Sequence, residues 1–168
     1  LVSSAGNNAQ DAVSSKRYPA VYESVISVMA LSSDKKQLAS FSNYDSTHEY
    51  YNIAAPGETI IGLPYSESAI NAVSGMSGTS QATPIIAGLA ALYLSVYPTH
   101  TPSEFRRALL ESSTDTCTSN SSVVTNAQYT FPVANAMKLL KYPHTEPAVK
   151  AVSGTTAAVD EERSFIYG

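Results

Sequence analysis

The segment Val25-Ile-Ser-Val-Met-Ala-Leu31 constrains the fold of this chain more than any other. All of its residues except Ser27 are apolar, and β-branched residues open it. A strand with one face in water alternates apolar and polar residues, whereas a strand of a parallel sheet is covered on both faces and is apolar almost throughout. The segment therefore predicts a buried strand in a mainly parallel sheet.

Shorter strand patterns lie before and after this segment. They are bounded by glycine, proline and asparagine, which favour turns. The first ends at Gly6-Asn7-Asn8, a combination that tolerates a left-handed backbone. The three predicted strands are Leu1–Ala5, Asn52–Ala55 and Glu58–Gly62.

Helix patterns follow in the second half of the chain. Apolar residues recur every three or four positions from Ala82 to Val96, which predicts a helix from Ser80 that ends before Pro98. Small residues fill its other face, so we expect burial on most sides. The sequence Thr101-Pro-Ser-Glu104 fits a capping box and predicts a second helix through about Ser112. A third helix is expected over Val133–Lys141.

The predicted strands lie early in the chain, the predicted helices lie late, and a long apolar helix lies between them. This order indicates an α/β architecture with a mainly parallel sheet. The composition changes after Pro143 to alanine, valine, threonine, serine and glutamate without a clear period. We therefore expect residues 1–142 to form part of a folded domain and residues 143–168 to be a C-terminal extension or linker.

Composition excludes several classes of function. The 168 residues are 43% hydrophobic and only 14% charged, with a net charge of −4 and no basic stripe, which argues against nucleic-acid binding. A polar surface built from serine, threonine and asparagine suits a secreted protein. The single cysteine, Cys117, excludes an internal disulfide, and no His or Cys pair has metal-ligand spacing. The longest apolar run, Pro84–Val96, is short for a membrane span.

The stretch Gly75-Met-Ser-Gly-Thr-Ser-Gln-Ala-Thr-Pro84 leads directly into the predicted long helix. A serine at a helix start lies beside unpaired N–H groups and the positive end of the helix dipole, which can stabilise an oxyanion. Ser80 is therefore a sensible nucleophile. On spacing alone, the simpler interpretation is that Thr79 or Ser80 is an ordinary N-cap. A Gly-x-Ser-x-Gly elbow is disfavoured, because Thr79 occupies the position of its second glycine.

The sequence Gly78-Thr-Ser-Gln-Ala-Thr-Pro84 resembles the Gly-Thr-Ser-x-Ala-x-Pro motif of subtilisin-like serine proteases. Upstream, Ser4-Ala-Gly-Asn7 is similar to the Ala-Ala-Gly-Asn turn of that family. The resemblance covers roughly residues 1–141 and implies the C-terminal half of a subtilisin-like fold. It further implies that Ser80 attacks a peptide carbonyl while the Asn7 amide and the Ser80 N–H stabilise the oxyanion. In isolation, Asn7 is better explained as a left-handed turn residue, and its pairing with Ser80 reverses that preference.

The family's triad runs in the order Asp, His, Ser, so the resemblance implies that both partners of Ser80 precede Leu1. The three histidines, His48, His100 and His144, lack the family's surrounding sequence, and we expect each to be a surface or loop residue. This chain alone should then be nearly inactive, and an upstream segment or chain is expected to carry the Asp and His. A protein or peptide is the expected substrate.

The resemblance also bears on specificity and ions. Ser4, Ala5 and Gly6 resemble the wall of the pocket for the residue before the scissile bond, and Arg17 falls at its far end. There Arg17 would favour acidic or polar side chains, whereas the alternative is a solvated loop charge. Many relatives bind calcium; Asn52 replaces a carboxylate at one such site, which makes that site doubtful, and no cofactor is required.

Two functions remain open from the sequence. The first is a serine endopeptidase completed by an upstream segment. The second is a catalytically incomplete half-domain that serves as a peptide-binding or structural scaffold. Residues preceding Leu1 would distinguish them. The sequon Asn120-Ser-Ser122 is either a glycosylation site or an unmodified loop.

Overall fold

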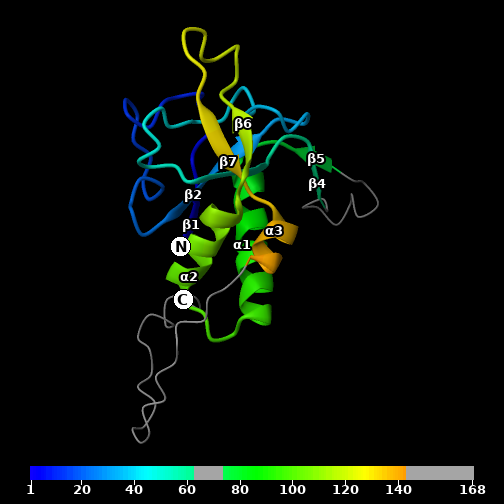
Figure 1. Ribbon diagram of the computed structural model, residues 1–168. Helices are drawn as coiled ribbons and strands as arrows, with labels where there is room; N and C mark the ends of the chain where they lie inside the picture. Colours follow the sequence, from blue (N-terminus) through cyan, green and yellow to red (C-terminus); the bar gives the residue numbers. More distant parts are fainter. Residues whose placement is uncertain (63–73, 143–168) are drawn as a thin grey trace, which may run out of the picture.

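A five-stranded sheet forms the centre of the fold. The computed structural model describes residues 1–62 and 74–142. Strands β1, β2, β3 and β7 pair in parallel, and β6 pairs with β7 in the antiparallel sense. The strand order is β1 (Val2–Ser4), β2 (Ile26–Leu31), β3 (Ile53–Pro56), β7 (Thr130–Val133) and β6 (Asp115–Thr118) (Figure 1). The sequence prediction of an α/β fold with a mainly parallel sheet is confirmed.

Strand β2 is buried along its whole length. Ile26, Val28 and Ala30 pack into a cluster shared with the helices, whereas Met29 and Leu31 pack into a second cluster with the loops on the opposite face. Alternate residues of a strand point to opposite faces, so both faces of the sheet are covered. This is the arrangement that the apolar segment predicts.

Three helices lie on one side of the sheet (Figure 1). They are α1 (Thr79–Val96), α2 (Pro102–Ser112) and α3 (Ala136–Lys141). Tyr93 of α1 is fully buried among them, with its ring 5.4 Å from that of Phe105 in α2. Its hydroxyl pairs with Nδ1 of His100 at 2.7 Å. An aromatic centre therefore joins the first two helices.

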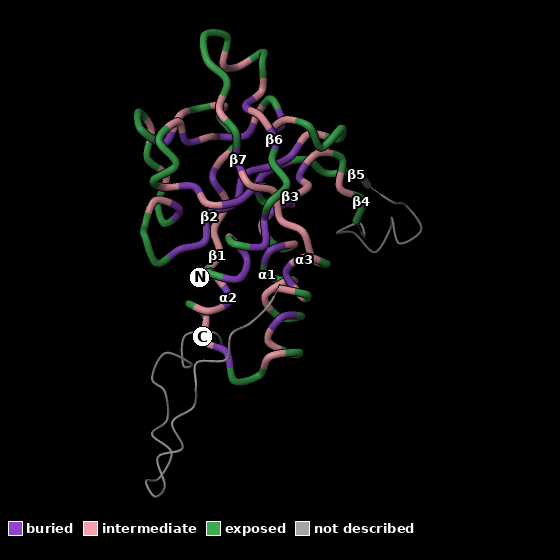
Figure 2. Tube along the Cα trace, in the orientation of Figure 1, coloured by how far each residue is buried: buried purple, intermediate pink, exposed green. Residues whose placement is uncertain are grey.

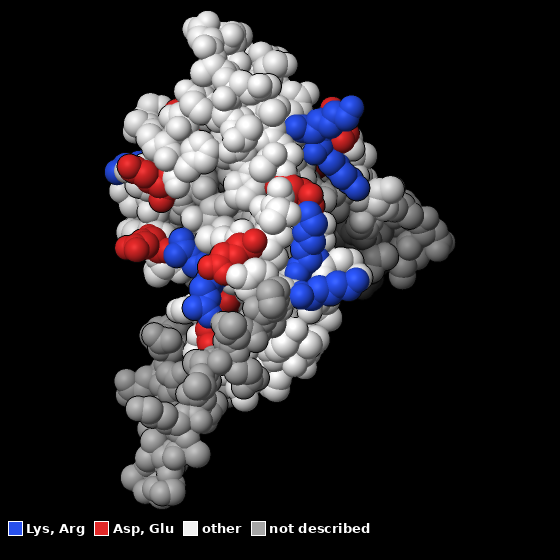
Figure 3. Space-filling view, viewed as in Figure 1, with Lys and Arg blue, Asp and Glu red and all other residues white. Residues whose placement is uncertain are grey.

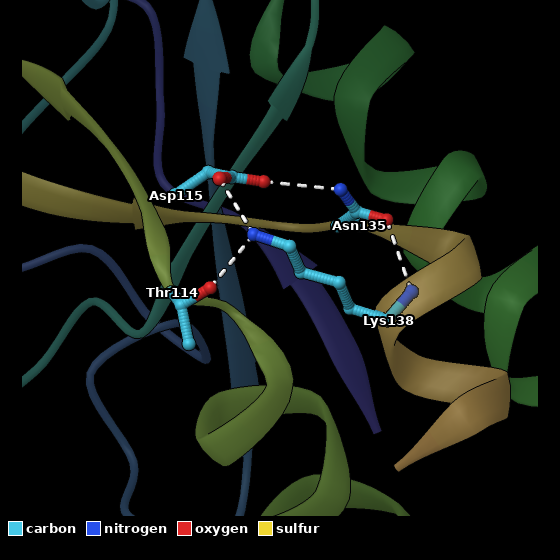
Figure 4. Close-up of polar contacts among 4 residues, drawn as sticks. All are labelled: Thr114, Asp115, Asn135 and Lys138. Atoms are coloured by element: carbon cyan, nitrogen blue, oxygen red, sulfur yellow. Dashed lines mark hydrogen bonds and ion pairs between the residues drawn. The ribbon is translucent and has the colours of Figure 1, made fainter.

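The starts of α2 and α3 are fixed by side-chain caps. At α2, Thr101 Oγ1 accepts from the Glu104 N–H and the Glu104 carboxylate accepts from the Thr101 N–H, as the capping box predicts. Helix α3 begins later than expected, because Val133 pairs within β7 and Asn135 caps the Lys138 N–H. Figure 4 shows Lys138 reaching Asp115 of β6 at 2.6 Å.

A separate two-stranded sheet lies beside the start of α1. Strand β4 (Ile60–Gly62) pairs antiparallel with β5 (Ser74–Met76). The sequence predicts β4 but misses β5, β6 and β7. Strand β6 reads Asp-Thr-Cys-Thr and β7 contains Pro132, so neither has the apolar pattern of a strand.

One face of α1 is exposed, which contradicts the expected burial on most sides. Only Thr79, Ala82, Ile86 and Tyr93 of this helix are buried (Figure 2). Its exposed residues are Ser80, Pro84, Ala87, Gly88, Ala91, Leu92, Ser95 and Val96. By length and composition alone, α1 is apolar enough to cross a membrane. Its contacts with β1, β2 and β3 nevertheless make it a core helix.

Both charge signs are mixed on the face drawn in Figure 3, where Lys and Arg lie beside Asp and Glu. Lys138 and Asp115 form an ion pair. The expected division at residue 142 falls at the edge of the described residues, and the predicted extension 143–168 lies outside them.

Candidate active site

Ser80 lies in the first turn of α1 with an exposed side chain. The preceding turn is fixed from two sides: the Gly78 N–H donates to Gly57 O at 2.8 Å, and Ser77 Oγ accepts from the Thr59 N–H at 2.9 Å. Ser77 therefore helps to shape the turn. Among residues 1–62 and 74–142, the Ser80 N–H donates to no acceptor. It can therefore donate a hydrogen bond to a ligand oxygen.

Asn7 is tied to the start of α1 by two hydrogen bonds. Its Oδ1 accepts from the Thr79 N–H and from the Thr79 hydroxyl, both at 2.8 Å. The Thr79 hydroxyl in turn accepts from the Gly6 N–H at 3.1 Å. Because the oxygen end of the amide is held in this way, the Nδ2 end is the one left to donate to a ligand.

The backbone of the 6–9 turn argues against the alternative role for Asn7. The left-handed residues of this turn are Gly6, with φ 104°, and Ala9, with φ 54°, and Asn7 is not among them. A side chain at Gly6 would also clash, since its Cβ would lie 2.6 Å from Asn43 Nδ2. Asn7 is thus held here by its side-chain contacts and not by a left-handed backbone.

Asn43 fixes the whole turn from the opposite side. This residue is fully buried; its Nδ2 donates to Ala5 O at 2.9 Å, and its Oδ1 accepts from the N–H groups of Asn8 and Gln10 at 2.9 and 3.0 Å. The sequence gives no sign of this role of Asn43, and it indicates Thr79 only as a possible N-cap. A buried polar residue that satisfies three backbone groups leaves no mark in its local sequence.

The residues of the expected specificity pocket lie around the same turn. Ser4 ends β1, Gly6 follows it, and the Ala5 side chain is fully buried in the core. The half-buried Arg17 donates through Nη2 to Asn8 Oδ1 at 2.8 Å and to Gln10 Oε1 at 3.1 Å. Its Cγ would lie 3.5 Å from a Cβ at Gly6. Arg17 is therefore a positioned cation beside the turn and not a freely solvated charge.

Two of the three histidines are engaged elsewhere. His48 is exposed in a loop, with Nε2 2.8 Å from Thr130 O and its ring stacked on Phe131. His100 is in a loop as expected but is buried, because its ring packs between Tyr93 and Tyr97. His144 lies outside the described residues.

Asn52, at the doubtful calcium site, is engaged in hydrogen bonds within the fold. Asn52 Oδ1 is used by Ser27, whose N–H donates at 3.1 Å and whose hydroxyl donates at 3.2 Å. Within the described part of the chain, no group of three or more His, Cys, Asp or Glu residues is placed to hold a metal.

The sequon asparagine is also engaged. Asn120 Nδ2 donates to Leu38 O at 2.9 Å, and its Oδ1 accepts from the Ser122 N–H at 3.0 Å. The nitrogen that glycosylation would modify therefore holds a loop in the folded protein.

Comparison with known sequences identifies relatives of the chain. The model of the subtilase family matches residues 1–130. Subtilisin DY of Bacillus licheniformis is 39% identical over 116 residues, which cover 68% of this chain and 39% of the relative. An extracellular serine proteinase of a Thermus strain is 43% identical over 110 residues, covering 66% of this chain and 25% of the relative.

Solved structures give the same result. The prenylagaramide maturation protease PagA superposes with a TM-score of 0.64 at 28% identity, over 84% of this chain and 49% of that protein. A cold-adapted subtilisin-like serine proteinase superposes with a TM-score of 0.57 at 32% identity, over 67% of this chain and 37% of that protein. The chain thus spans half or less of the length of these relatives.

Proposed function

The chain belongs to the subtilase family of serine proteases, and on this premise we propose that it is the part of a serine endopeptidase that supplies the nucleophile, Ser80, and the oxyanion-binding amide of Asn7. The observation that carries the proposal is the double hydrogen bond from Thr79 to Asn7 Oδ1. These bonds hold the oxygen end of the amide, which supports a role for the Nδ2 end as a donor to a ligand beside Ser80.

In this proposal, Ser80 Oγ attacks the carbonyl carbon of the scissile peptide bond. The carbonyl oxygen becomes an oxyanion and accepts hydrogen bonds from Asn7 Nδ2 and the Ser80 N–H, while the positive end of α1 favours the developing charge. The C–N bond then breaks, the amine leaves with a proton, and water releases the acyl group from Ser80. A preformed donor pair of this kind stabilises the transition state more than the substrate.

We propose that the base and the acid of the triad come from residues outside this chain. His48 and His100 are bonded to Thr130 O and Tyr93, which supports a source elsewhere. The exposed face of α1 supports the same conclusion, because Leu92 is 45% exposed and Val96 51% exposed on a helix that carries Ser80 near its start. A segment packed along this face would cover apolar surface and reach Ser80.

We further propose that Ser4, Ala5, Gly6 and Arg17 contribute to the pocket for the residue before the scissile bond. The cationic side chain of Arg17, held by Asn8 and Gln10, would favour an acidic or polar side chain there. A peptide library with a preference for Lys or Arg at this position would remove the hypothesis. Secretion is proposed because relatives such as the Thermus proteinase are named extracellular.

The test of the proposed function is covalent labelling of the full-length protein by a fluorophosphonate probe, followed by mapping of the modified peptide. We expect modification at Ser80, loss of labelling in Ser80→Ala and retention in Ser77→Ala, which changes a neighbouring hydroxyl of the same turn. A folded full-length protein that remains unlabelled would favour the alternative, a catalytically incomplete scaffold.

A further inference from the structure

The space beside Gly78 is surrounded by three polar groups. A methyl group placed on this glycine would lie 3.2 Å from Asn7 Nδ2 and 3.7 Å from Ser80 N, the two proposed oxyanion donors. It would lie 2.7 Å from a third atom, Oε1 of Gln81. Gly78 has an extended backbone, with φ 161°, which any residue can adopt. Glycine is therefore needed here because it leaves this space open, and not because of its backbone conformation.

Gln81 follows Ser80 in the first turn of α1 and is half-buried. Its N–H donates to Gly78 O at 3.0 Å, which fixes its backbone over the glycine. The carboxamide thus faces the same space as Asn7 Nδ2 and the Ser80 N–H. An acceptor oxygen, Gln81 Oε1, therefore lies beside the same space as the two proposed donors.

An acceptor in this position is unfavourable once negative charge develops on a substrate oxygen. The torsion that turns a glutamine carboxamide is broad and roughly two-fold, so rotation by half a turn exchanges Oε1 for Nε2 at little cost. The rotated group would then donate an N–H to the oxyanion.

We propose that Gln81 is a third oxyanion-binding residue, which contacts the substrate oxygen through Nε2 when the tetrahedral intermediate forms. This inference rests on the proposed function, since it requires a reaction at Ser80. It adds a third donor, Gln81 Nε2, to the two already proposed, Asn7 Nδ2 and the Ser80 N–H. No bond to Gln81 forms or breaks, and only its hydrogen-bonding partner changes.

The experiment compares Gln81→Met and Gln81→Glu in the full-length protein on a peptide substrate, with Gln128→Met as the matched control at an exposed glutamine between β6 and β7. Removing one oxyanion donor typically lowers kcat by about 10²–10³, and with two donors remaining we expect at least about a tenfold loss in Gln81→Met. KM and the thermal midpoint should stay near those of the parent, and Gln128→Met should be unaffected.

Gln81→Glu tests the role through the pH dependence of kcat, which would not change if Gln81 had only a structural role. The introduced carboxylate has the shape of glutamine but repels an oxyanion, whereas its protonated form can donate. The kcat ratio of Gln81→Glu to the parent should therefore rise as pH falls from 8 to 5. A pH-independent ratio, or an unchanged kcat in Gln81→Met while fluorophosphonate still labels Ser80, would overturn this inference alone. Absence of labelling in the parent would instead overturn the proposed function.

Discussion

The substitution Thr79→Val separates the packing of Thr79 from its hydrogen bonds. Thr79 is fully buried, and valine keeps its β-branched shape while replacing the hydroxyl by a methyl group. The change removes the donor to Asn7 Oδ1 and the acceptor of the Gly6 N–H. The Asn7 amide would then be held by the Thr79 N–H alone.

The magnitude follows from these contacts. The lost hydrogen bond and the unpaired part-buried N–H each cost about 1 kcal/mol, and the added methyl returns about 0.8 kcal/mol. The free energy of unfolding should therefore fall by about 1 kcal/mol. We expect kcat to fall about tenfold, below the 10²–10³ typical of losing a whole oxyanion donor, because one anchor of Asn7 remains. KM should change little.

Thr79→Ser is the matched control, because it keeps the hydroxyl and loses the methyl group. Its loss of stability should also be about 1 kcal/mol, from the deleted buried methyl, but its kcat should stay near that of the parent. Peptide hydrolysis and urea unfolding of the full-length variants give both quantities. Equal kcat values for the valine and serine variants would refute the argument that the Thr79 hydroxyl orients Asn7.

Other predictions follow from the burial and the caps. Burial raises the pKa of Cys117 to about 12, so a thiol reagent at pH 8 should react only after unfolding in urea; prompt reaction of the native protein would contradict this. Burial pushes the pKa of Asp45 upward, but hydrogen bonds from the Thr47 hydroxyl and from the Tyr50 and Tyr51 N–H groups outweigh it and hold the pKa below its ordinary value. The resulting stability is present above the unfolded pKa of about 3.9 and is lost as pH falls through the folded pKa; urea midpoints of Asp45→Asn should decline less in acid than those of the parent. Thr101→Ala should lower the free energy of unfolding by about 1 kcal/mol through loss of the helix cap, and an unchanged urea midpoint would exclude that role.

Features set by local sequence could be predicted, and features set by distant contacts could not. The capping box at Thr101 and the apolar strand before Leu31 each depend on adjacent residues, and the structure has both. Val133 is apolar enough to begin a helix, but pairing with Ala54 and Asp115 places it in a strand. The burial of His100 depends on packing against Tyr93 and could not be seen locally.

The residues of the candidate site also fall into those that local sequence indicates and those that depend on distant contacts. Ser80 and Asn7 lie in recognisable local motifs, whereas the positions of Thr79 and Asn43 in the hydrogen-bond network depend on contacts across 72 and 35 residues of chain. A lone asparagine between Ser42 and Tyr44 gives no sign that it satisfies three backbone groups of another loop. Arg17 was assigned by resemblance, and its partners Asn8 and Gln10 became evident only in the structure.

The anchoring of the turn by Asn43 and Thr79 has a consequence for protein engineering. In the proposed function, the groups seen to orient the Asn7 amide are the Thr79 N–H and hydroxyl, which belong to the same chain as Ser80, so the oxyanion-binding groups are positioned by contacts within this chain. On that proposal, a protease assembled from two pieces would carry its oxyanion-binding groups in the piece that contains Asn7, Thr79 and Ser80. Adding the piece that supplies proton transfer would then switch on such a protease, which is a basis for a conditionally activated enzyme.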